Sequence, residues 1–349
     1  MLQKNGYNVE VAVFDRDNYK PREIHTAYTV LGNISHGDYG RRLRVFLQAI
    51  PKLRRLVKQN DLVYSSGLDM LFLSVISSLF LKKKQVVEVG DIREIQVDKS
   101  WKGKIYRKIE NWFLKRTHLV VVTSSAFLSE YFHGYHSYKI KGLVLENKLD
   151  MDLSIRETFL PQQKPVGEKI RIGYFGLLRC KWSLKVLTQL VKNYGDRFEV
   201  VLAGLITHQN EHDEIVALDN TSYLGLYKSP DDLSAIYANV DMIWACYQPF
   251  EENDYNLRWA RPNRFYESCF FGKPLFTRNG CQDAFEVKKL NIGYLIDDSD
   301  PEITSGKIAT ITNDNFNIWQ NNILSLPPDI FVYTREDLEL KETIDHLFN

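Results

Sequence analysis

The chain has 349 residues, 44% of them hydrophobic, which is enough apolar material for two domains with separate cores. Its 45 basic and 44 acidic residues leave a net charge of +1, so the composition gives no sign of a nucleic-acid partner. No apolar run approaches the roughly 20 residues that span a bilayer, and the four cysteines lack paired or metal-type spacing. These features predict a reduced, cytoplasmic protein.

Strand-like and helical stretches alternate through the first half, as they do in parallel α/β sheets. Strands are expected at residues 7–14, 61–65, 85–89, 118–123 and 142–145. Helices are expected at residues 39–58, 68–82, 101–116 and 125–132. Residues 1–6 resemble the tail of a helix leading into a strand, so we expect this domain to lack its first strand.

A second α/β series follows a linker-like segment, residues 150–169, that contains two prolines. Its strands are expected at residues 170–178, 198–203, 222–224, 240–247, 274–277 and 294–296. Ser229, followed by Pro230, has the features of a helix N-cap, and a last helix is expected at residues 335–348.

These elements predict two Rossmann-like domains that face a cleft, residues 1–150 and 151–334, with residues 335–349 packing back on the first. Open α/β sheets bind ligands at the carboxyl ends of their strands. The loops after residues 178, 203, 226 and 247 are therefore the candidate site.

Residues 261–274 have the order expected of a helix that follows a buried strand and a polar loop. Pro262 suits the first helical turn, where its missing N–H costs nothing, and Gly272 can end the helix. Apolar side chains at regular spacing can face the core: Phe265, Cys269 and Phe270.

The start of this helix also carries groups suited to a nucleotide-sugar. Asn263 and Glu267 are four residues apart and therefore share one face near the N-terminus. The positive end of the helix, flanked by Arg261 and Arg264, suits a diphosphate. A carboxylate one turn further can accept hydrogen bonds from paired sugar hydroxyls.

Over nearly its whole length the chain resembles bacterial GT-B glycosyltransferases, in particular glycosyltransferase family 4 and related enzymes of surface-polysaccharide assembly. The segments that carry the resemblance are residues 173–181, 223–225, 233–241, 262–267 and 272–274 in the second half, and residues 88–91 and 145–150 in the first. The closest local match is Pro262-Asn263-Arg264-Phe265-Tyr266-Glu267.

The resemblance implies transfer of a sugar from a nucleotide diphosphate-sugar donor to a glycan or lipid-linked acceptor. Retention at the anomeric carbon, and chemistry without a metal or another cofactor, are the family expectations. The implied catalytic residues are Arg179, Lys181 and Glu267, joined in donor binding by Gly176, Asn263 and Arg264. The implied acceptor-side residues are Asp91 and Arg93.

Two departures from the family leave other functions open, and one is that the usual glycine-rich loop after the first strand is absent. Family 4 enzymes commonly have two glutamates eight residues apart; Glu267 fits the second, but Ala260 stands at the first. Glu251 and Glu252 lie upstream in a longer loop and are candidates to replace it. The alternatives are a GT-B-like nucleotide-sugar epimerase, which needs no acceptor, and a catalytically silent partner subunit.

The order His-x-x-Glu-His at residues 208–212 matches an inverted zinc-protease motif. That motif requires an apolar helix with both histidines on one face. The stretch is polar and indicates a loop instead, so we expect no metal site here.

Residues 101–116 interleave aromatic and aliphatic side chains with six cations. Such a helix could rest on an anionic membrane, at its inner face, and present the enzyme to a lipid-linked acceptor. The simpler interpretation, which the need to cover the following strand favours, is an amphipathic helix that faces the core and has solvated cations.

Overall fold

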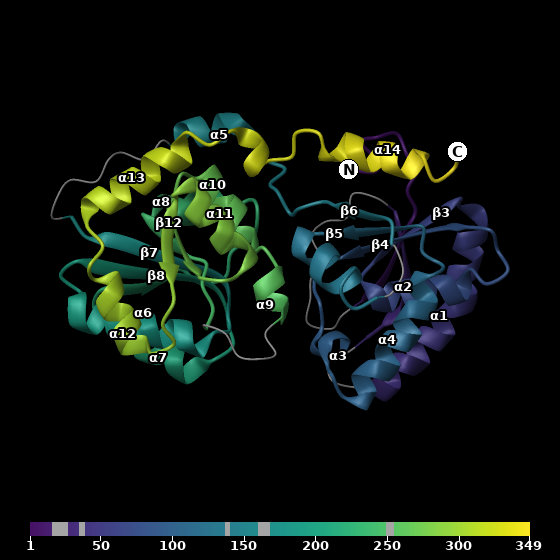
Figure 1. Ribbon diagram of the computed structural model, residues 1–349, viewed down its shortest axis with the longest axis horizontal. Coiled ribbons are helices and arrows are strands. Elements are labelled where there is room, and N and C mark those ends of the chain that lie inside the picture. Colours follow the sequence, from purple (N-terminus) through teal and green to yellow (C-terminus); the bar gives the residue numbers. More distant parts are fainter. Residues whose placement is uncertain (16–26, 35–38, 137–139, 160–167, 249–254) are drawn as a thin grey trace. The chain divides into compact units, whose positions relative to one another are not determined.

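The computed structural model describes residues 1–15, 27–34, 39–136, 140–159, 168–248 and 255–349 (Figure 1). It divides into two compact units. Unit 1 comprises Met1–Glu146 together with Arg335–Asn349, and unit 2 comprises Asn147–Thr334. The chain therefore leaves unit 1 once and returns to it for its last helix.

Unit 2 is built on a six-stranded parallel sheet with the order β12-β11-β10-β7-β8-β9. The strands are β7 (Ile170–Leu178), β8 (Phe198–Ile206), β9 (Thr221–Tyr223), β10 (Met242–Trp244), β11 (Leu275–Arg278) and β12 (Gly293–Ile296). Because strand side chains alternate between faces, Tyr174 of β7 enters one buried apolar cluster and Phe175 enters another. The sheet is thus covered on both faces, as parallel sheets require.

Helices supply the two coverings. The first cluster takes side chains from α6 (Lys181–Tyr194), α7 (Gln209–Val216), α12 (Pro301–Ile308) and α13 (Asn313–Leu324). The second takes them from α8 (Leu233–Ala238), α10 (Asn263–Phe270), α11 (Gln282–Leu290) and again α13. Two short helices complete the unit, α5 (Leu153–Thr158) and α9 (Tyr255–Trp259), along with the 3-10 turn η2 (Pro328–Ile330).

Unit 1 contains a four-stranded parallel sheet, β3-β4-β5-β6, and a separate parallel pair, β1-β2. The strands are β1 (Val11–Asp15), β2 (Tyr28–Asn33), β3 (Leu62–Ser66), β4 (Lys84–Val89), β5 (Leu119–Val122) and β6 (Gly142–Val144). The helices are α1 (Tyr39–Gln59), α2 (Leu68–Ser77), α3 (Glu94–Val97), α4 (Trp101–Leu114), the π-helical η1 (Phe127–Phe132) and α14 (Glu336–Asp345).

The last helix, α14, is held in unit 1 by both apolar and polar contacts. Leu340 and Ile344 join the cluster that contains Val86 of β4. Tyr7 donates a hydrogen bond to the Asp345 carboxylate at 2.6 Å, which ties the two ends of the chain together. Burial and this bond raise the pKa of Tyr7 to about 12.

Most expected strands are present, but several predictions about elements were wrong. Strand β2 was not predicted, and β10 is limited to Met242–Trp244, although the Ala245 N–H still donates to the Phe276 carbonyl of β11 at 2.9 Å. Helix α2 ends at Ser77, since Phe80 adopts a left-handed backbone with φ of 66°. The helix predicted at residues 125–132 is a π-helical segment, Phe127–Phe132.

Two polar stretches were also misassigned. The helix predicted to begin after Ser229 begins at Leu233, because Asp232 uses its carboxylate to accept the Lys228 N–H at 2.7 Å and closes a turn. The stretch 208–212, predicted as a loop, enters α7. Its second histidine, His212, is buried and packs edge-on against the Tyr223 ring. This contact gives the helix a buried face, although the sequence of the stretch is polar.

Candidate functional site

Two glycines near the carboxyl end of strands in the unit 2 sheet have backbone angles that only glycine adopts readily. Gly176 of β7 and Gly204 of β8 are paired, with φ of 101° and 123° respectively. A Cβ on Gly204 would lie 1.9 Å from the Gly176 carbonyl oxygen, so only glycine fits there. Among the described residues, a Cβ on Gly176 would meet only the Tyr227 hydroxyl, at 3.8 Å. No other described residue covers the Gly176 backbone on that side.

Two of the predicted cations follow directly after β7. The Arg179 guanidinium lies over the Tyr247 ring, 5.7 Å from its centre, and the Arg179 carbonyl is 2.9 Å from a ring nitrogen of His208. Lys181 is the first residue of α6 and its ammonium is 3.1 Å from Glu211 of α7. Lys181 thus combines an exposed charge with the positive end of a 14-residue helix.

Arg264 occupies a different environment from the one expected of an exposed phosphate ligand. It is 7% exposed. Its Nη1 donates to the Phe175 carbonyl at 3.1 Å, and its Nη2 donates to the Tyr247 hydroxyl at 2.6 Å. Arg264 therefore links the start of α10 to the end of β7 and to the segment after β10, and it brings a buried positive charge under this edge of the sheet.

Glu267 lies one turn further along α10 and is 4% exposed. The Tyr237 hydroxyl of α8 donates to its carboxylate at 2.8 Å. Loss of solvation raises the pKa of Glu267, although the Tyr237 hydrogen bond and the Arg264 charge act in the opposite direction. Burial, with the Glu267 charge as a second cause, raises the pKa of Tyr227 to about 12.

The predicted donor residues are therefore gathered on neighbouring elements of unit 2. Arg264 bonds to the strand that carries Gly176, and Glu267 bonds to Tyr237, whose ring lies 5.3 Å from that of Phe175. Asn263, the first residue of α10, is exposed. Glu251 and Glu252 lie outside the described residues.

Sequence reasoning missed the aromatic residues that complete this arrangement: Tyr227, Tyr237 and Tyr247. Tyr247 ends the apolar run that contains β10, a position where a polar tip could have been noticed. The other two follow no spacing rule relative to α10, since their proximity depends on the fold.

The predicted acceptor-side residues lie in unit 1. The Arg93 guanidinium bonds both oxygens of Asp69 at 2.8 Å, and Arg42 donates to the same carboxylate at 3.0 Å. Asp69 and Arg42 were not predicted. Asp69 lies in the first turn of α2, which follows β3, and Arg42 lies near the start of α1. Asp91 is exposed on the segment that follows β4.

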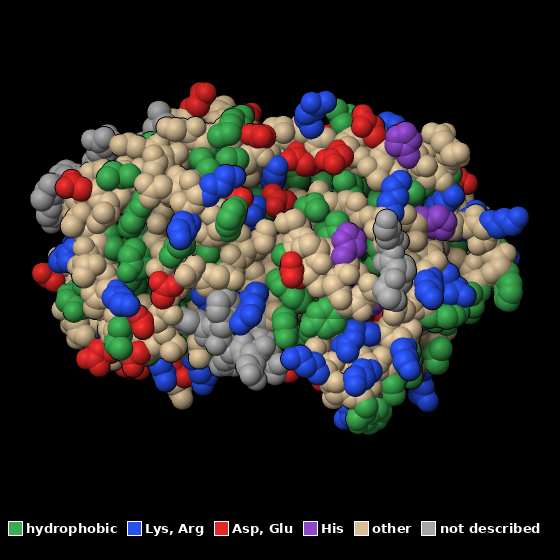
Figure 2. Space-filling model, viewed as in Figure 1, with side chains coloured by type: hydrophobic (Ala, Val, Ile, Leu, Met, Phe, Trp, Pro, Cys, Tyr) green, Lys and Arg blue, Asp and Glu red, His purple; other side chains and the backbone are tan. Residues whose placement is uncertain are grey.

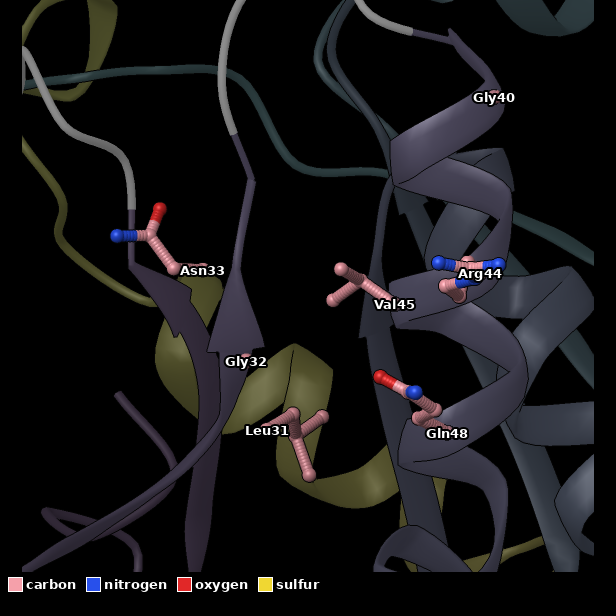
Figure 3. A pocket seen from close by; sticks show the side chains of 7 residues that line it. All are labelled: Leu31, Gly32, Asn33, Gly40, Arg44, Val45 and Gln48. Carbon is pink, nitrogen blue, oxygen red and sulfur yellow. The ribbon is translucent and has the colours of Figure 1, made fainter.

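Unit 1 also has a hollow of about 750 Å³ between β2 and α1 (Figure 3). Its lining includes Asn33 from the strand and Arg44 and Gln48 from the helix. In Figure 3 the Gln48 and Val45 side chains extend from α1 toward the strand. The bare Gly32 makes room for Val45, because a Cβ there would lie 2.6 Å from its Cγ1.

Within the described ranges, no three side chains of His, Cys, Asp or Glu are grouped so that they could hold a metal ion. Every helix of the described residues is too short or too polar to cross a bilayer. All four cysteines are free thiols.

Comparison with known proteins identifies relatives of similar length. No family model matches the chain. It is 28% identical to succinoglycan biosynthesis protein ExoL of Rhizobium meliloti over 350 residues, covering 97% of this chain and 86% of the relative.

Solved structures share the fold at low sequence identity. Alr3699/HepE of Anabaena, in complex with UDP and glucose, matches with a TM-score of 0.68 at 15% identity over 91% of this chain and 86% of its own. Sucrose-phosphate synthase of Thermosynechococcus elongatus gives 0.73 at 12% identity, with 99% and 90% covered. WaaG, a glycosyltransferase involved in lipopolysaccharide biosynthesis, gives 0.61 at 14% identity, with 92% and 87% covered. The predicted GT-B fold class is thereby confirmed.

Proposed function

We propose that this chain is a glycosyltransferase of surface-polysaccharide assembly that transfers a sugar from a nucleotide diphosphate-sugar to a glycan or lipid-linked acceptor. The observation that carries the proposal is the single helix, α10, that places Arg264 under the end of β7 and Glu267 against Tyr237. The relative named for succinoglycan biosynthesis and the UDP complexes of HepE support it.

The proposal assigns the donor diphosphate to the end of β7. Arg179, Lys181 and the start of α6 supply positive charge there, and Arg264 adds a buried charge nearby. Fixed cations that neutralise the departing diphosphate lower the barrier to transfer, since they require no reorganisation during the reaction. The uncovered backbone at Gly176 leaves room for the donor to approach.

The proposal assigns the ribose of the donor to Glu267 and Asn263. One Glu267 oxygen accepts the Tyr237 hydroxyl, and we assign the other to the paired ribose hydroxyls. Retention at the anomeric carbon, and transfer without a bound metal, complete the proposal. The stereochemistry is read directly from the product by NMR of its anomeric proton.

The acceptor is assigned to unit 1. The Asp91 and Arg93 segment after β4, together with the polar hollow beside α1, offers charged and hydroxyl-binding groups. Assay products formed with donor alone distinguish the alternatives, because an epimerase converts the donor to an isomer without any acceptor.

A matched pair of lysines tests the diphosphate assignment. Lys181 and Lys192 both lie on α6, and both pair with glutamates of α7, at 3.1 and 2.8 Å. Calorimetric titration with UDP-glucose and other nucleotide diphosphate-sugars should show roughly tenfold weaker binding in Lys181→Ala, the loss expected for one charge-assisted hydrogen bond. Lys192→Ala, at the far end of the helix, should bind as the wild type does.

Two outcomes would contradict the proposal. Equal donor affinities of the two lysine variants would show that the diphosphate does not bind at the end of β7. Failure of the wild-type chain to bind any nucleotide-sugar, combined with stable binding to another transferase, would establish the silent partner subunit instead.

A further inference from the structure

Helix α4 of unit 1 turns an apolar row away from the core. Its outward residues are Trp101, 67% exposed, Ile105, 48%, Ile109, 49%, and Trp112, 42%. At roughly 100° per residue, these four lie within an arc of about 80° on the helix. The opposite side, which includes the fully buried Glu110, faces the core. The expectation that the apolar side chains of this helix face the core therefore holds for Tyr106 and Phe113, which pack against the Phe72 ring, and is wrong for these four.

Cations border this row on both sides. They are Lys102, Lys104, Lys108, Lys115 and Arg116, all exposed. The Arg116 guanidinium lies 3.6 Å from the centre of the Trp112 ring, and the Lys102 ammonium lies 5.8 Å from Trp101. Within Trp101–Leu114 the only carboxylate is the buried Glu110, so the exposed face carries positive charge alone.

A second apolar group lies beside the end of α4. Phe80, in the loop after α2, is 100% exposed and has a φ of 66°, a conformation that is unfavourable for a bulky side chain. Arg54 fixes this loop by donating to the Ser77 and Leu79 carbonyls, each at 2.9 Å. Phe80, Lys82 and Arg116 line one hollow of about 420 Å³, so the loop and the helix end are neighbours.

We propose that the outward face of α4 and the Phe80 loop form a docking surface for an anionic lipid bilayer. Interfacial helices place Trp and aliphatic side chains at the acyl boundary and Lys or Arg among the headgroups, which is the arrangement found here. Lys and Arg side chains gather with hydrophobic ones over α4 and α1 in Figure 2, where Figure 1 places these helices.

Charge decides between a bilayer and a protein as the occupant. The cores of protein interfaces are depleted in lysine, whereas this row is enclosed by it. In a symmetric dimer the row would meet its own copy, so that like charges would face each other. Anionic headgroups are complementary to the same cations.

Vesicle flotation of the complete chain tests the proposal. We expect binding to phosphatidylcholine vesicles that contain 30% phosphatidylglycerol, and little binding to phosphatidylcholine alone or at 0.5 M salt. Trp101→Ser with Ile105→Ser should lower the partition coefficient at least tenfold. Lys104→Glu with Lys108→Glu should lower it at least 25-fold, at roughly fivefold or more per charge.

Matched controls lie on α11 of unit 2. Phe285 is 70% exposed, about as much as Trp101, so Phe285→Ser should leave vesicle binding unchanged, as should Lys288→Glu with Lys289→Glu. Absence of vesicle binding, or equal losses in the α4 and α11 variants, would overturn the proposal. So would a dimer in solution that Trp101→Ser dissociates, since a second copy would then be the occupant. None of these variants changes a proposed donor-binding residue, so the outcome of the vesicle experiment is independent of the outcome of the donor titration.

Discussion

Glu267 and Asp283 are carboxyl groups placed where water solvates their charges poorly. Each is nearly fully buried in unit 2. Tyr237 donates to the Glu267 carboxylate at 2.8 Å, and Thr277 donates to that of Asp283 at 3.1 Å. Burial nevertheless dominates and raises the pKa of both groups. Side chains kept at such a cost are candidates for function.

These raised pKa values give the stability of unit 2 a defined pH dependence. The folded chain holds the two protons more tightly than the unfolded chain, whose carboxyl pKa values are about 4. The stabilisation is therefore fully present below about pH 4 and is lost as the pH rises through the raised pKa values. Glu267→Gln should reduce that loss, measured as the free energy of unfolding in urea between pH 4 and 8.

An exposed glutamate provides the control for this pH dependence. Glu214 is 54% exposed and pairs with Lys192 at the surface. Glu214→Gln should leave the slope of stability against pH nearly unchanged. An identical slope in Glu267→Gln and the wild type would show that burial does not govern Glu267.

Strands β7 and β8 are joined at a point that only glycine tolerates. Gly204→Ala would place a Cβ 1.9 Å from the Gly176 carbonyl oxygen, so the two strands would have to separate. We expect a loss of about 3 kcal/mol or more in the free energy of unfolding, measured by urea titration. The change should also weaken donor binding, because it displaces the backbone at Gly176.

A substitution at Gly225 serves as the control, because it introduces the strain of a positive φ without the steric clash expected at Gly204. It has a φ of 84°, but a Cβ there would meet no atom of the described residues within 4 Å. Gly225→Ala should cost only about 1–2 kcal/mol, the strain of a left-handed residue. Equal losses in the two variants would mean that the close approach of β7 and β8 contributes little.

The spacing of apolar residues predicted which of them are buried in α10 but not in α4. In α10 the predicted core residues Phe265, Cys269 and Phe270 are buried, as is every other residue from Arg264 to Phe270, which the spacing did not indicate. In α4, apolar residues lie on both sides, with Phe113 inward and Trp112 outward, so periodicity could not say which face meets the core. Their orientation depends on packing against other elements.

At the scale of the whole molecule, the order of strands and helices was enough to predict two α/β units and the GT-B fold class. The partners of Arg264 were not predictable. Phe175 and Tyr247 are 89 and 17 residues away along the chain, and only the folded sheet brings them to the guanidinium. Side-chain environments of this kind require the tertiary structure, even where the residue itself was identified.

The central claim, a nucleotide-sugar site on α10 of unit 2, is tested most directly by calorimetric titration of the complete chain with nucleotide diphosphate-sugars. The wild type should bind one donor per chain. Glu267→Gln preserves the size of the side chain and an oxygen for Tyr237, whereas Glu267→Ala would strand the Tyr237 hydroxyl. We predict about 10- to 100-fold weaker binding in Glu267→Gln, the range for losing hydrogen bonds to a charged group. Unchanged donor affinity in this variant, with its fold intact, would contradict the account.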